Sequence, residues 1–419
     1  MIAAACAAVA VAGCAGGNSS TSPAVPAAAV VRGVAATEPA ADAAPYGSAD
    51  TAFGLDVLRA WCTGYPGKNL VFSPSTLASA LGLAYLGARG STAAGIASVL
   101  HLPQAGPGLD AGLQARSKGL AGLDGPGVTL SPGNQVWADP SLPPARDYLD
   151  AVATSYDAGV AQAPFLTDPV EAAGQVNKAI SADTRGQISN LVTPGSVTDA
   201  GWVLTSALYL NAKWQSPFDA GKTQAGAFTL AGGKTVTAQY LDGDGFSYTE
   251  SDGWTAVGLP YAGGKLTMTA LLPPSGSGSC ALPGQAGLAS MTQALATNDS
   301  AATATIDLPK VSLATNGETG DMRSVLTQLG MGQAFSGAAD FTGLSAKAGK
   351  LAFVQQAATL KVTEKGTVAA AAAAVGVEPG SAMVHPVVIS FNRPYLLLVS
   401  AKATGEPLFL AEVANPAAG

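Results

Sequence analysis

The sequence predicts an α+β fold, because helical patterns fill its first half and strand patterns follow without regular alternation. Residues 69–77 pass from a short strand into a helix, with Ser73 as the N-cap and Pro74 in the first helical turn. Residues 202–210 form a nearly continuous apolar run, as expected of a strand buried on both faces. Further apolar runs of strand length dominate the C-terminal part of the chain.

The elements follow in chain order. The first helix continues to Gly87, a turn at 87–92 follows, and a second helix runs to Leu100. His101 precedes a Leu-Pro pair and is predicted to cap the C-terminus of that helix. A third helix at 176–186 stops at a glycine. Strands are then predicted at residues 202–210, 266–272, 304–309, 351–363, 387–391, 395–401 and 407–412.

Length and charge limit the possible classes of protein. The chain has 419 residues, enough for one large core or for two or three smaller domains, and 48% of them are hydrophobic, which excludes global disorder. It carries 21 Lys and Arg against 28 Asp and Glu, so no basic field is available to hold nucleic acid phosphates.

The N-terminus is predicted to direct export. Residues 1–13 match a signal peptide whose apolar run is too short to span a bilayer, which takes about 20 residues. The Val-Ala-Gly sequence before Cys14 resembles a bacterial lipoprotein box, which implies a lipid on the Cys14 thiol and a location on the cell surface. Because no Lys or Arg precedes the apolar run, an ordinary secretory signal is the alternative. Residues 14–50 contain almost no large side chains and are predicted to be a disordered tether, followed by a single domain at 51–417.

The residues that usually carry catalysis or bind metals are scarce. Cys62 and Cys280 remain in the folded part, either as one disulfide or as two separate half-buried thiols. The only histidines, His101 and His385, lie in no catalytic or metal-binding motif. The Asp-Gly repeat at 242–245 suggests a turn rather than a calcium loop. The sequence therefore predicts no enzyme activity, no cofactor and no metal.

A series of short motifs in one order covers residues 51–416. They are Asn69-Leu-Val-Phe-Ser-Pro-Ser-Thr-Leu77, Gly87-Ala-Arg-Gly-Ser-Thr92, Asn211-Ala-Lys-Trp214 with Pro217-Phe218, Leu259-Pro-Tyr261, Leu308-Pro-Lys310, Leu329-Gly-Met331 with Asp340-Phe341, Glu364-Lys-Gly-Thr367, Phe391-Asn-Arg-Pro-Tyr395, and Leu408-Phe409 before Asn415-Pro416. This series resembles the serpin family of serine protease inhibitors. The resemblance implies a single domain with three mixed or antiparallel β-sheets, eight or nine helices and an exposed reactive loop near the C-terminus.

The resemblance also implies a function. Inhibitory serpins act as suicide substrates: a protease attacks the loop, forms an acyl ester, and is trapped when the cleaved loop inserts into the central sheet. The implied hinge consists of Glu364, Gly366, Thr367, Ala369, Ala370, Ala371 and Ala372. Gly366 gives it freedom, Thr367 is the first side chain to be buried, and no residue from 366 to 377 is charged or bulky.

The implied sheet-opening region contains Ser73, Thr76, Ser206 and Gln356. Relatives usually carry an Asn and a His where this chain has Ser206 and Gln356, which can still form a hydrogen bond with each other.

Two counts place the reactive bond differently. Counting from the hinge glutamate places it at Gly380-Ser381, whereas counting back from Pro394 places it at Met383-Val384; the first is favoured. Glu378 is the only charged residue between 366 and 390, so the expected targets are elastase-, chymotrypsin- or subtilisin-like proteases, and not trypsin-like ones.

Two rival functions stay open. One is a non-inhibitory serpin-fold binding protein, which a charged or bulky hinge would favour. The other, from a different class, is a surface lipoprotein that binds a solute, suggested by the lipobox and the tether. A protease complex that survives boiling in detergent would separate the inhibitor from both. The protein is expected to be a monomer.

Overall fold

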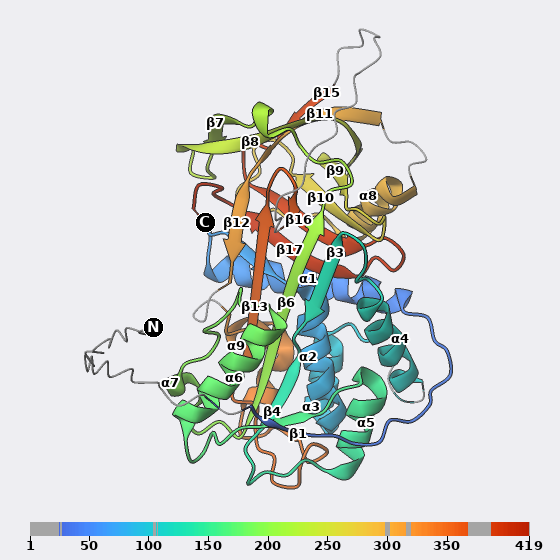
Figure 1. Cartoon of the computed structure of the whole chain (residues 1–419), viewed down its shortest axis with the longest axis vertical. Coiled ribbons are helices and arrows are strands. Elements are labelled where there is room, and N and C mark those ends of the chain that lie inside the picture. Colours follow the sequence, from blue (N-terminus) through green and yellow to red (C-terminus); the bar gives the residue numbers. More distant parts are fainter. Residues whose placement is uncertain are drawn as a thin grey trace, which may run out of the picture.

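The computed structural model describes residues 25, 27–103, 106, 108–297, 302–315, 320–367 and 387–418. Within these residues the fold is mixed α+β, as predicted, with most helices gathered around one half of the molecule (Figure 1). The α-helices are α1 (Ala44–Gly64), α2 (Pro74–Gly87), α3 (Gly90–Val99), α4 (Leu109–Ala121), α5 (Arg146–Tyr156), α6 (Pro169–Asp183), α7 (Pro194–Val197), α8 (Gln285–Thr297) and α9 (Arg323–Leu326). Shorter helical turns are η1 (Ala220–Lys222), η2 (Thr327–Met331) and η3 (Gly332–Phe335).

An eight-stranded sheet lies in the half that carries most helices. The order β1-β5-β4-β6-β13-β12 runs across it, and β3 and β14 also pair with β6. Its strands are β1 (Ala29–Val31), β3 (Val128–Pro132), β4 (Gln135–Ala138), β5 (Val160–Gln162), β6 (Trp202–Lys213), β12 (Val311–Ala314), β13 (Val354–Val362) and β14 (Gly366–Thr367). Both faces are covered, one by α6 and the other by α2. This explains why β6 is apolar almost without interruption.

The second sheet has nine strands among the described residues. The order is β15-β11-β8-β9-β10-β16-β17-β2, and β7 also pairs with β8. Its strands are β2 (Leu70–Phe72), β7 (Gln224–Thr229), β8 (Thr235–Ser251), β9 (Trp254–Pro260), β10 (Leu266–Leu272), β11 (Ala302–Pro309), β15 (Val387–Ser390), β16 (Tyr395–Ala401) and β17 (Pro407–Val413). Strand β8 pairs with β7 at one end, with β11 along its middle and with β9 at the other end, so it joins these strands into one sheet.

The predicted turn at 242–245 is wrong, because these residues lie inside β8. The chain stays in the strand, and the register between β8 and β11 shifts here, which marks a bulge. Gly245 has a φ of 81°, a left-handed conformation that glycine adopts without strain. The two glycines therefore mark a bend within one strand and do not separate two strands.

Helix boundaries follow from capping residues. The Ser73 hydroxyl accepts a hydrogen bond from the Thr76 amide at 3.2 Å and Pro74 occupies the first turn of α2, as predicted. The predicted helix at 176–186 starts earlier, at Pro169, because Asp168 caps it. His101 lies just past α3 with a φ of 48°, and its ring contacts Asp56 of α1 at 2.9 Å.

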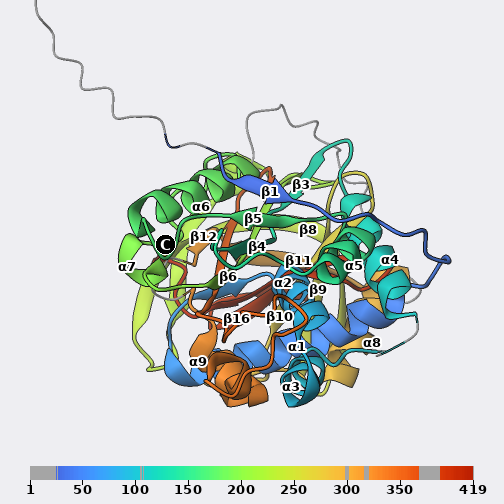
Figure 2. The same ribbon diagram turned by 90° about the horizontal axis from the view of Figure 1, so that it is seen from below.

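The prediction of a disordered tether at 14–50 must be corrected for residues 29–31 and 44–50. Residues 29–31 form β1, which pairs antiparallel with β5 at the sheet edge (Figure 2). Helix α1 starts at Ala44. Small side chains hid this order, because a strand added to an edge is held mainly by its backbone groups. After β1, the chain is held by α5, where the Val34 amide donates to the Asp150 carboxylate at 2.7 Å.

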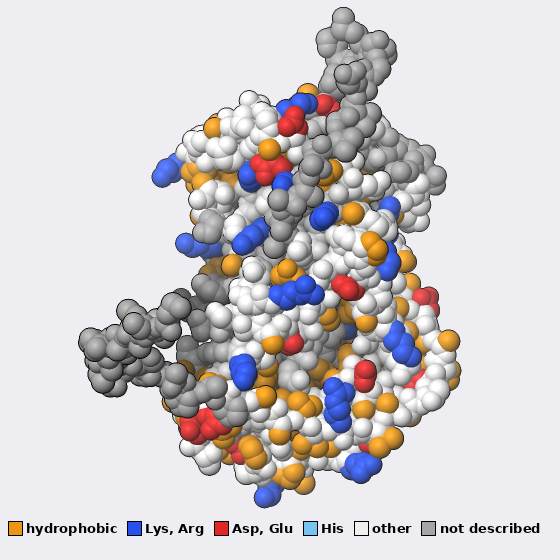
Figure 3. Space-filling view, in the orientation of Figure 1, with side chains coloured by type: hydrophobic (Ala, Val, Ile, Leu, Met, Phe, Trp, Pro, Cys, Tyr) orange, Lys and Arg blue, Asp and Glu red, His pale blue; other side chains and the backbone are white. Residues whose placement is uncertain are grey.

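The predicted signal peptide and Cys14 lie outside the described residues. In the part of the chain that is described, no helix is both long and apolar enough to cross a membrane. On the face in Figure 3, Lys and Arg side chains are spread singly over the surface. This face therefore presents no continuous basic patch among the described residues.

Candidate functional site

The two central strands of the eight-stranded sheet separate along their length. Strands β6 and β13 are paired in parallel only where residues 204–208 face residues 354–358. Further along, β13 pairs with β12, and β6 pairs on that same edge with the two-residue strand β14. The start of the predicted hinge thus occupies the edge of β6 that β13 leaves; strands β6 and β13 are labelled in Figure 1. We call the line between β6 and β13 the seam.

Gly366 is required where the chain enters the seam. It has a φ of 142°, and a Cβ built on it would lie 2.1 Å from the Ala212 carbonyl oxygen. Any side chain would therefore clash with the backbone of β6. The turn into the seam is tied by the Thr363 hydroxyl, which donates to the Gly366 carbonyl at 2.8 Å. Two properties therefore require glycine at position 366, which is part of the predicted hinge: the positive φ and the lack of space for a Cβ atom.

Thr367 is already buried in the intact chain. It is fully inaccessible, and its hydroxyl lies 2.6 Å from the Tyr261 hydroxyl. The Tyr261 ring stacks on Trp214 with a centroid distance of 4.5 Å, and burial raises the pKa of Tyr261 well above its ordinary range. Thr367, which the family resemblance names as the first hinge side chain to enter the sheet, is thus buried in the intact chain.

Glu364 anchors the hinge from outside the sheet. Its carboxylate accepts hydrogen bonds from Lys310 at 2.7 Å and from the Thr223 hydroxyl at 3.0 Å. Although partial burial alone would raise the pKa of Glu364, these hydrogen bonds lower it below its ordinary value. The backbone is held too, since the Trp214 indole donates to the Thr363 carbonyl at 2.8 Å.

The predicted sheet-opening residues come together under the paired part of the seam. The Ser206 hydroxyl of β6 donates to the Thr76 hydroxyl of α2 at 3.0 Å, and Ser73 caps the same helix turn. All three are almost completely buried. This contact links α2 to β6 beside the paired part of the seam.

Gln356 lies beside Ser206 in the register of β13 and β6, but the two side chains do not form the hydrogen bond that their chemistry allows. Ser206 instead donates to Thr76 of α2. In the described part of the chain, neither the Nε2 nor the Oε1 atom of the fully buried Gln356 has a hydrogen-bond partner. An unpaired buried amide costs about 1–3 kcal/mol of folding free energy, so Gln356 destabilises the paired part of the seam.

Several predicted site residues lie outside the described residues. They are Ala369, Ala370, Ala371, Ala372, Gly380, Ser381, Met383 and Val384 of the loop and the lipidation residue Cys14.

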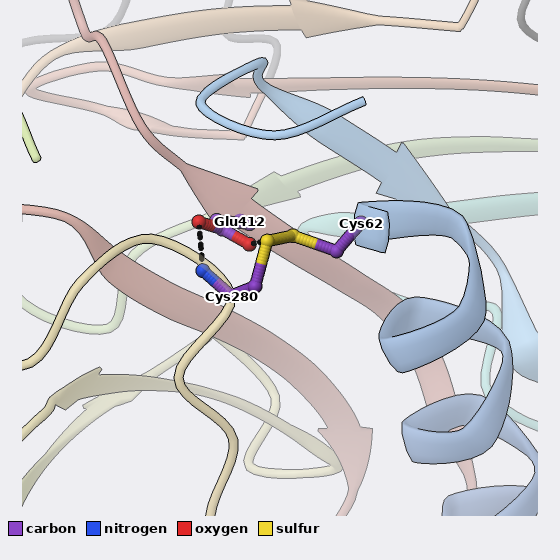
Figure 4. A group of neighbouring side chains, drawn as sticks. All are labelled: Cys62, Cys280 and Glu412. Carbon is purple, nitrogen blue, oxygen red and sulfur yellow. Dashed lines mark hydrogen bonds between the residues drawn. A yellow bond between two sulfur atoms is a disulfide. The ribbon is translucent and has the colours of Figure 1, made fainter. Parts of the chain in front are cut away.

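The two remaining cysteines form a disulfide, which resolves one open alternative (Figure 4). Cys62 of α1 and Cys280 have Cα atoms 5.8 Å apart. Glu412 of β17 lies against the bridge and accepts a hydrogen bond from the Cys280 amide at 2.7 Å. Burial raises the pKa of the Glu412 carboxyl, although that hydrogen bond opposes the shift. The bridge ties α1 to the segment between β10 and α8.

Sequence reasoning missed the residues that hold the hinge in place. Tyr261, Trp214 and Lys310 occur in the motifs quoted above but received no role, and Thr223 lies in none of them. A weak signal existed, because the Lys-Trp and Pro-Tyr pairs place an aromatic residue directly after the strands that end at Lys213 and Pro260. Only the fold brings these four side chains to residues 363–367.

Comparison with known proteins identifies the class. The family model described as "Serpin (serine protease inhibitor)" matches residues 48–416, so the chain belongs to the serpin family. It is 30% identical over 356 residues to an uncharacterized serpin-like protein of Thermococcus kodakarensis, covering 84% of this chain and 82% of that protein. It is 27% identical over 379 residues to the leukocyte elastase inhibitor of Bos taurus, covering 88% and 99%.

The fold also matches a solved structure. The native state of the thermophilic serpin tengpin aligns with a TM-score of 0.77 and 21% identity, covering 93% of this chain and 100% of that one. At this level of identity the match concerns the fold alone.

Proposed function

We propose that this protein inhibits serine proteases as a suicide substrate. The observation that carries the proposal is the seam, where β6 and β13 are paired at one end and Gly366 and Thr367 already lie along β6 at the other. Strand insertion would continue from these two residues. The small residues that follow in the sequence would meet no steric or charge barrier.

The chemistry would be divided between the two proteins. The serine of the protease attacks the carbonyl carbon of the scissile residue, the peptide C–N bond breaks, and the protease supplies a proton to the leaving amine. The ester that remains links the enzyme to the loop. This chain contributes no catalytic group to that step; it contributes a strand that moves the ester away from its productive position before water attacks.

Insertion would be favourable because the seam is incomplete. A new strand between β6 and β13 would pair backbone groups along both neighbours over the part where they have separated. It would also rearrange the contacts around the unpaired amide of Gln356. Both changes lower the free energy of the cleaved form relative to the intact one.

The test is a covalent complex. Full-length protein incubated with pancreatic elastase, chymotrypsin, subtilisin or trypsin is boiled in detergent and run on a gel. We expect a higher-mass band with one or more of the first three and only cleavage or no reaction with trypsin, since the loop has no Lys or Arg. Cleavage of the loop without a stable complex for every serine protease would exclude inhibition and favour a binding protein.

Mass spectrometry of the peptide released from the complex locates the bond. A fragment that begins at Ser381 supports the favoured position, and one that begins at Val384 supports the alternative. A cut outside 378–385 contradicts both.

We also propose that the protein is exported and anchored through a lipid on Cys14. The disulfide between Cys62 and Cys280 supports export, because disulfides persist in oxidising compartments. In cells fed with an alkyne fatty acid, the wild type should become labelled and Cys14→Ala should not. An unlabelled wild type recovered from the medium would instead support an ordinary secretory signal.

A further inference from the structure

Three side chains of the kinds that bind metals meet at the disulfide (Figure 4). Cys62 comes from the end of α1, Cys280 from the segment between β10 and α8, and Glu412 from β17. Their two sulfur atoms and a carboxylate oxygen all lie within 4.8 Å of one another. No sequence motif predicts this group, because the two cysteines are 218 residues apart and the acid lies in a third element.

Glu412 is a buried acid without a neutralising cation. It is 1% exposed, and in the described part of the chain it forms no ion pair. One of its carboxyl oxygens accepts a hydrogen bond from the Cys280 amide at 2.7 Å, and the other lies 3.0 Å from the Cys62 sulfur. Buried carboxylates are normally paired with a cation or coordinate a metal. The second oxygen thus lies where a cation held by the sulfurs would meet it.

A small cavity adjoins two of these three side chains. It has a volume of about 10 Å³, and Cys280, Glu412 and Tyr395 contribute to its lining. This is close to the space of roughly 10–15 Å³ that one water molecule needs. Tyr395 is 1% exposed, and within the described residues its hydroxyl has no hydrogen-bond partner. The cavity therefore offers room for one water ligand next to a residue whose hydroxyl is unpaired.

The two sulfurs must separate before a metal can bind between them. Two thiolates on one tetrahedral Zn²⁺ ion lie about 3.8 Å apart, since each Zn–S bond is about 2.3 Å long. The Cα atoms of Cys62 and Cys280 are 5.8 Å apart, so rotation of the side chains is enough to reach that spacing. Cys280 is half-buried and lies outside the helices and strands, which leaves its side chain room to rotate.

We propose that Cys62, Cys280 and Glu412 bind one Zn²⁺ ion once the disulfide is reduced. Two thiolates and a carboxylate suit zinc, whereas Ca²⁺ and Mg²⁺ prefer oxygen ligands alone. A water in the cavity beside Tyr395 would complete the tetrahedron. The metal would take over the structural role of the disulfide, because it would tie α1, the segment before α8 and β17 together.

Reduction and metal binding are separate steps. A phosphine reductant attacks one sulfur, the S–S bond breaks, and water supplies the oxygen of the phosphine oxide and the protons of the two thiols. The disulfide gains the two electrons that the phosphine loses. Zn²⁺ then binds without a change in oxidation state and releases the two thiol protons to the solvent. The proposal does not depend on protease inhibition, because the hydrogen bonds that hold residues 363–367 involve none of the three ligands.

The probe is Co²⁺, which occupies zinc sites and absorbs visible light strongly when thiolates hold it in a tetrahedron. In every full-length protein tested, Cys6 and Cys14 are replaced by serine, so the disulfide supplies the only thiols. The protein is reduced with tris(2-carboxyethyl)phosphine, and the excess is removed under nitrogen. We expect the reduced protein to bind one Co²⁺ per chain with cobalt–thiolate bands that Zn²⁺ abolishes. The oxidised protein should show no such bands.

A substitution of the carboxylate tests the third ligand. Glu412→Gln keeps an acceptor for the Cys280 amide and removes the charge, so the Co²⁺ affinity of the reduced protein should fall about tenfold or more. Because this variant can still form the disulfide, the melting temperature of its oxidised form checks that it folds. The matched control Glu250→Gln changes an exposed acid and should leave the affinity within a factor of two.

Thermal unfolding gives a second readout on the unaltered site. Zn²⁺ should raise the melting temperature of the reduced protein and leave that of the oxidised protein unchanged, since a ligand that binds the folded state stabilises it. The proposal would be overturned by a reduced protein that binds no Co²⁺ saturably, by bands that lack thiolate character, or by equal binding before reduction. An unchanged affinity in a folded Glu412→Gln variant would overturn it as well.

Discussion

The seam of the eight-stranded sheet and the centre of the nine-stranded sheet are both buried, yet they are built in opposite ways. Strands β10, β16 and β17 are paired over most of their lengths, and every residue of β16 and β17 is buried. In the seam, by contrast, β6 and β13 are paired over only a few residues, and the side-chain amide of Gln356 has no hydrogen-bond partner in the described part of the chain. At one end, β14 pairs with β6 in place of β13. The difference shows that the incomplete strand pairing of this fold is concentrated at the seam, whereas the nine-stranded sheet is continuously paired and well packed. We call strands β10, β16 and β17 the rigid frame.

A charge at the entrance of the seam should have the largest effect. Thr367→Arg places a guanidinium where a fully buried hydroxyl meets Tyr261, at a cost of several kcal/mol. We expect the detergent-stable protease complex to disappear while cleavage of the loop continues. Thr367→Ser, which keeps the hydroxyl, should retain the complex; an unchanged yield in the arginine variant would mean that the hinge inserts elsewhere.

A cavity in the rigid frame should lower stability without affecting the seam. Leu397 of β16 is fully buried, and truncating such a residue to alanine usually costs about 2–5 kcal/mol. We expect Leu397→Ala to lower the melting temperatures of the intact and the loop-cleaved protein by similar amounts. If only the intact form were destabilised, the two regions would not be independent.

Removing the unpaired amide should stabilise the intact seam. Gln356→Met keeps the side-chain length without the polar atoms, and we expect the free energy of unfolding of the intact protein to rise by about 1–3 kcal/mol. The fraction of cleavage events that end in a complex should fall, because less energy is released on insertion. The exposed control Gln224→Met should change neither quantity, and a destabilised Gln356→Met would indicate a partner for the amide.

The smallest expected effect is on the anchor of the hinge. The pKa of Glu364 lies below its ordinary value of 4.5, so its ion pair with Lys310 stabilises the folded protein above that pH. This contribution is lost as the pH falls through the lowered pKa. In thermal unfolding, Glu364→Gln should therefore melt below the wild type at pH 7, and the difference should shrink as the pH falls below 4.5. A difference that persists in acid would rule out the carboxylate as its source.

The sequence predicted the elements well where local signals were complete. The Ser73 cap and the apolar runs that became β10 and β16 were predicted within their limits, because capping and burial on both faces leave direct traces in the residues. The order at 29–36 was missed because it depends on backbone pairing of β1 with β5 and on α5 side chains that accept hydrogen bonds from backbone amides, which small residues do not signal. The bulge in β8 was misread as a turn, because closely spaced glycines are typical both of turns and of β-bulges.

The candidate site could be predicted only in part. Gly366 and Thr367 were found through the family pattern, but their place beside β6 depends on a gap between strands distant in sequence. The roles of Tyr261 and Lys310 depend on the same packing. The sequence left a hydrogen bond between Ser206 and Gln356 possible, and only the fold shows that Ser206 donates to Thr76 of α2 instead.

The most direct test of the seam is the stability of the protein before and after a single cut in its loop. Full-length protein is nicked with a small amount of elastase, the nick is verified by mass spectrometry, and the melting temperatures of the two forms are compared. Insertion of the freed strand between β6 and β13 should raise the melting temperature by tens of degrees, as release of stored strain implies. A nicked form that melts at or below the intact form would contradict the claim that the seam opens to accept the loop.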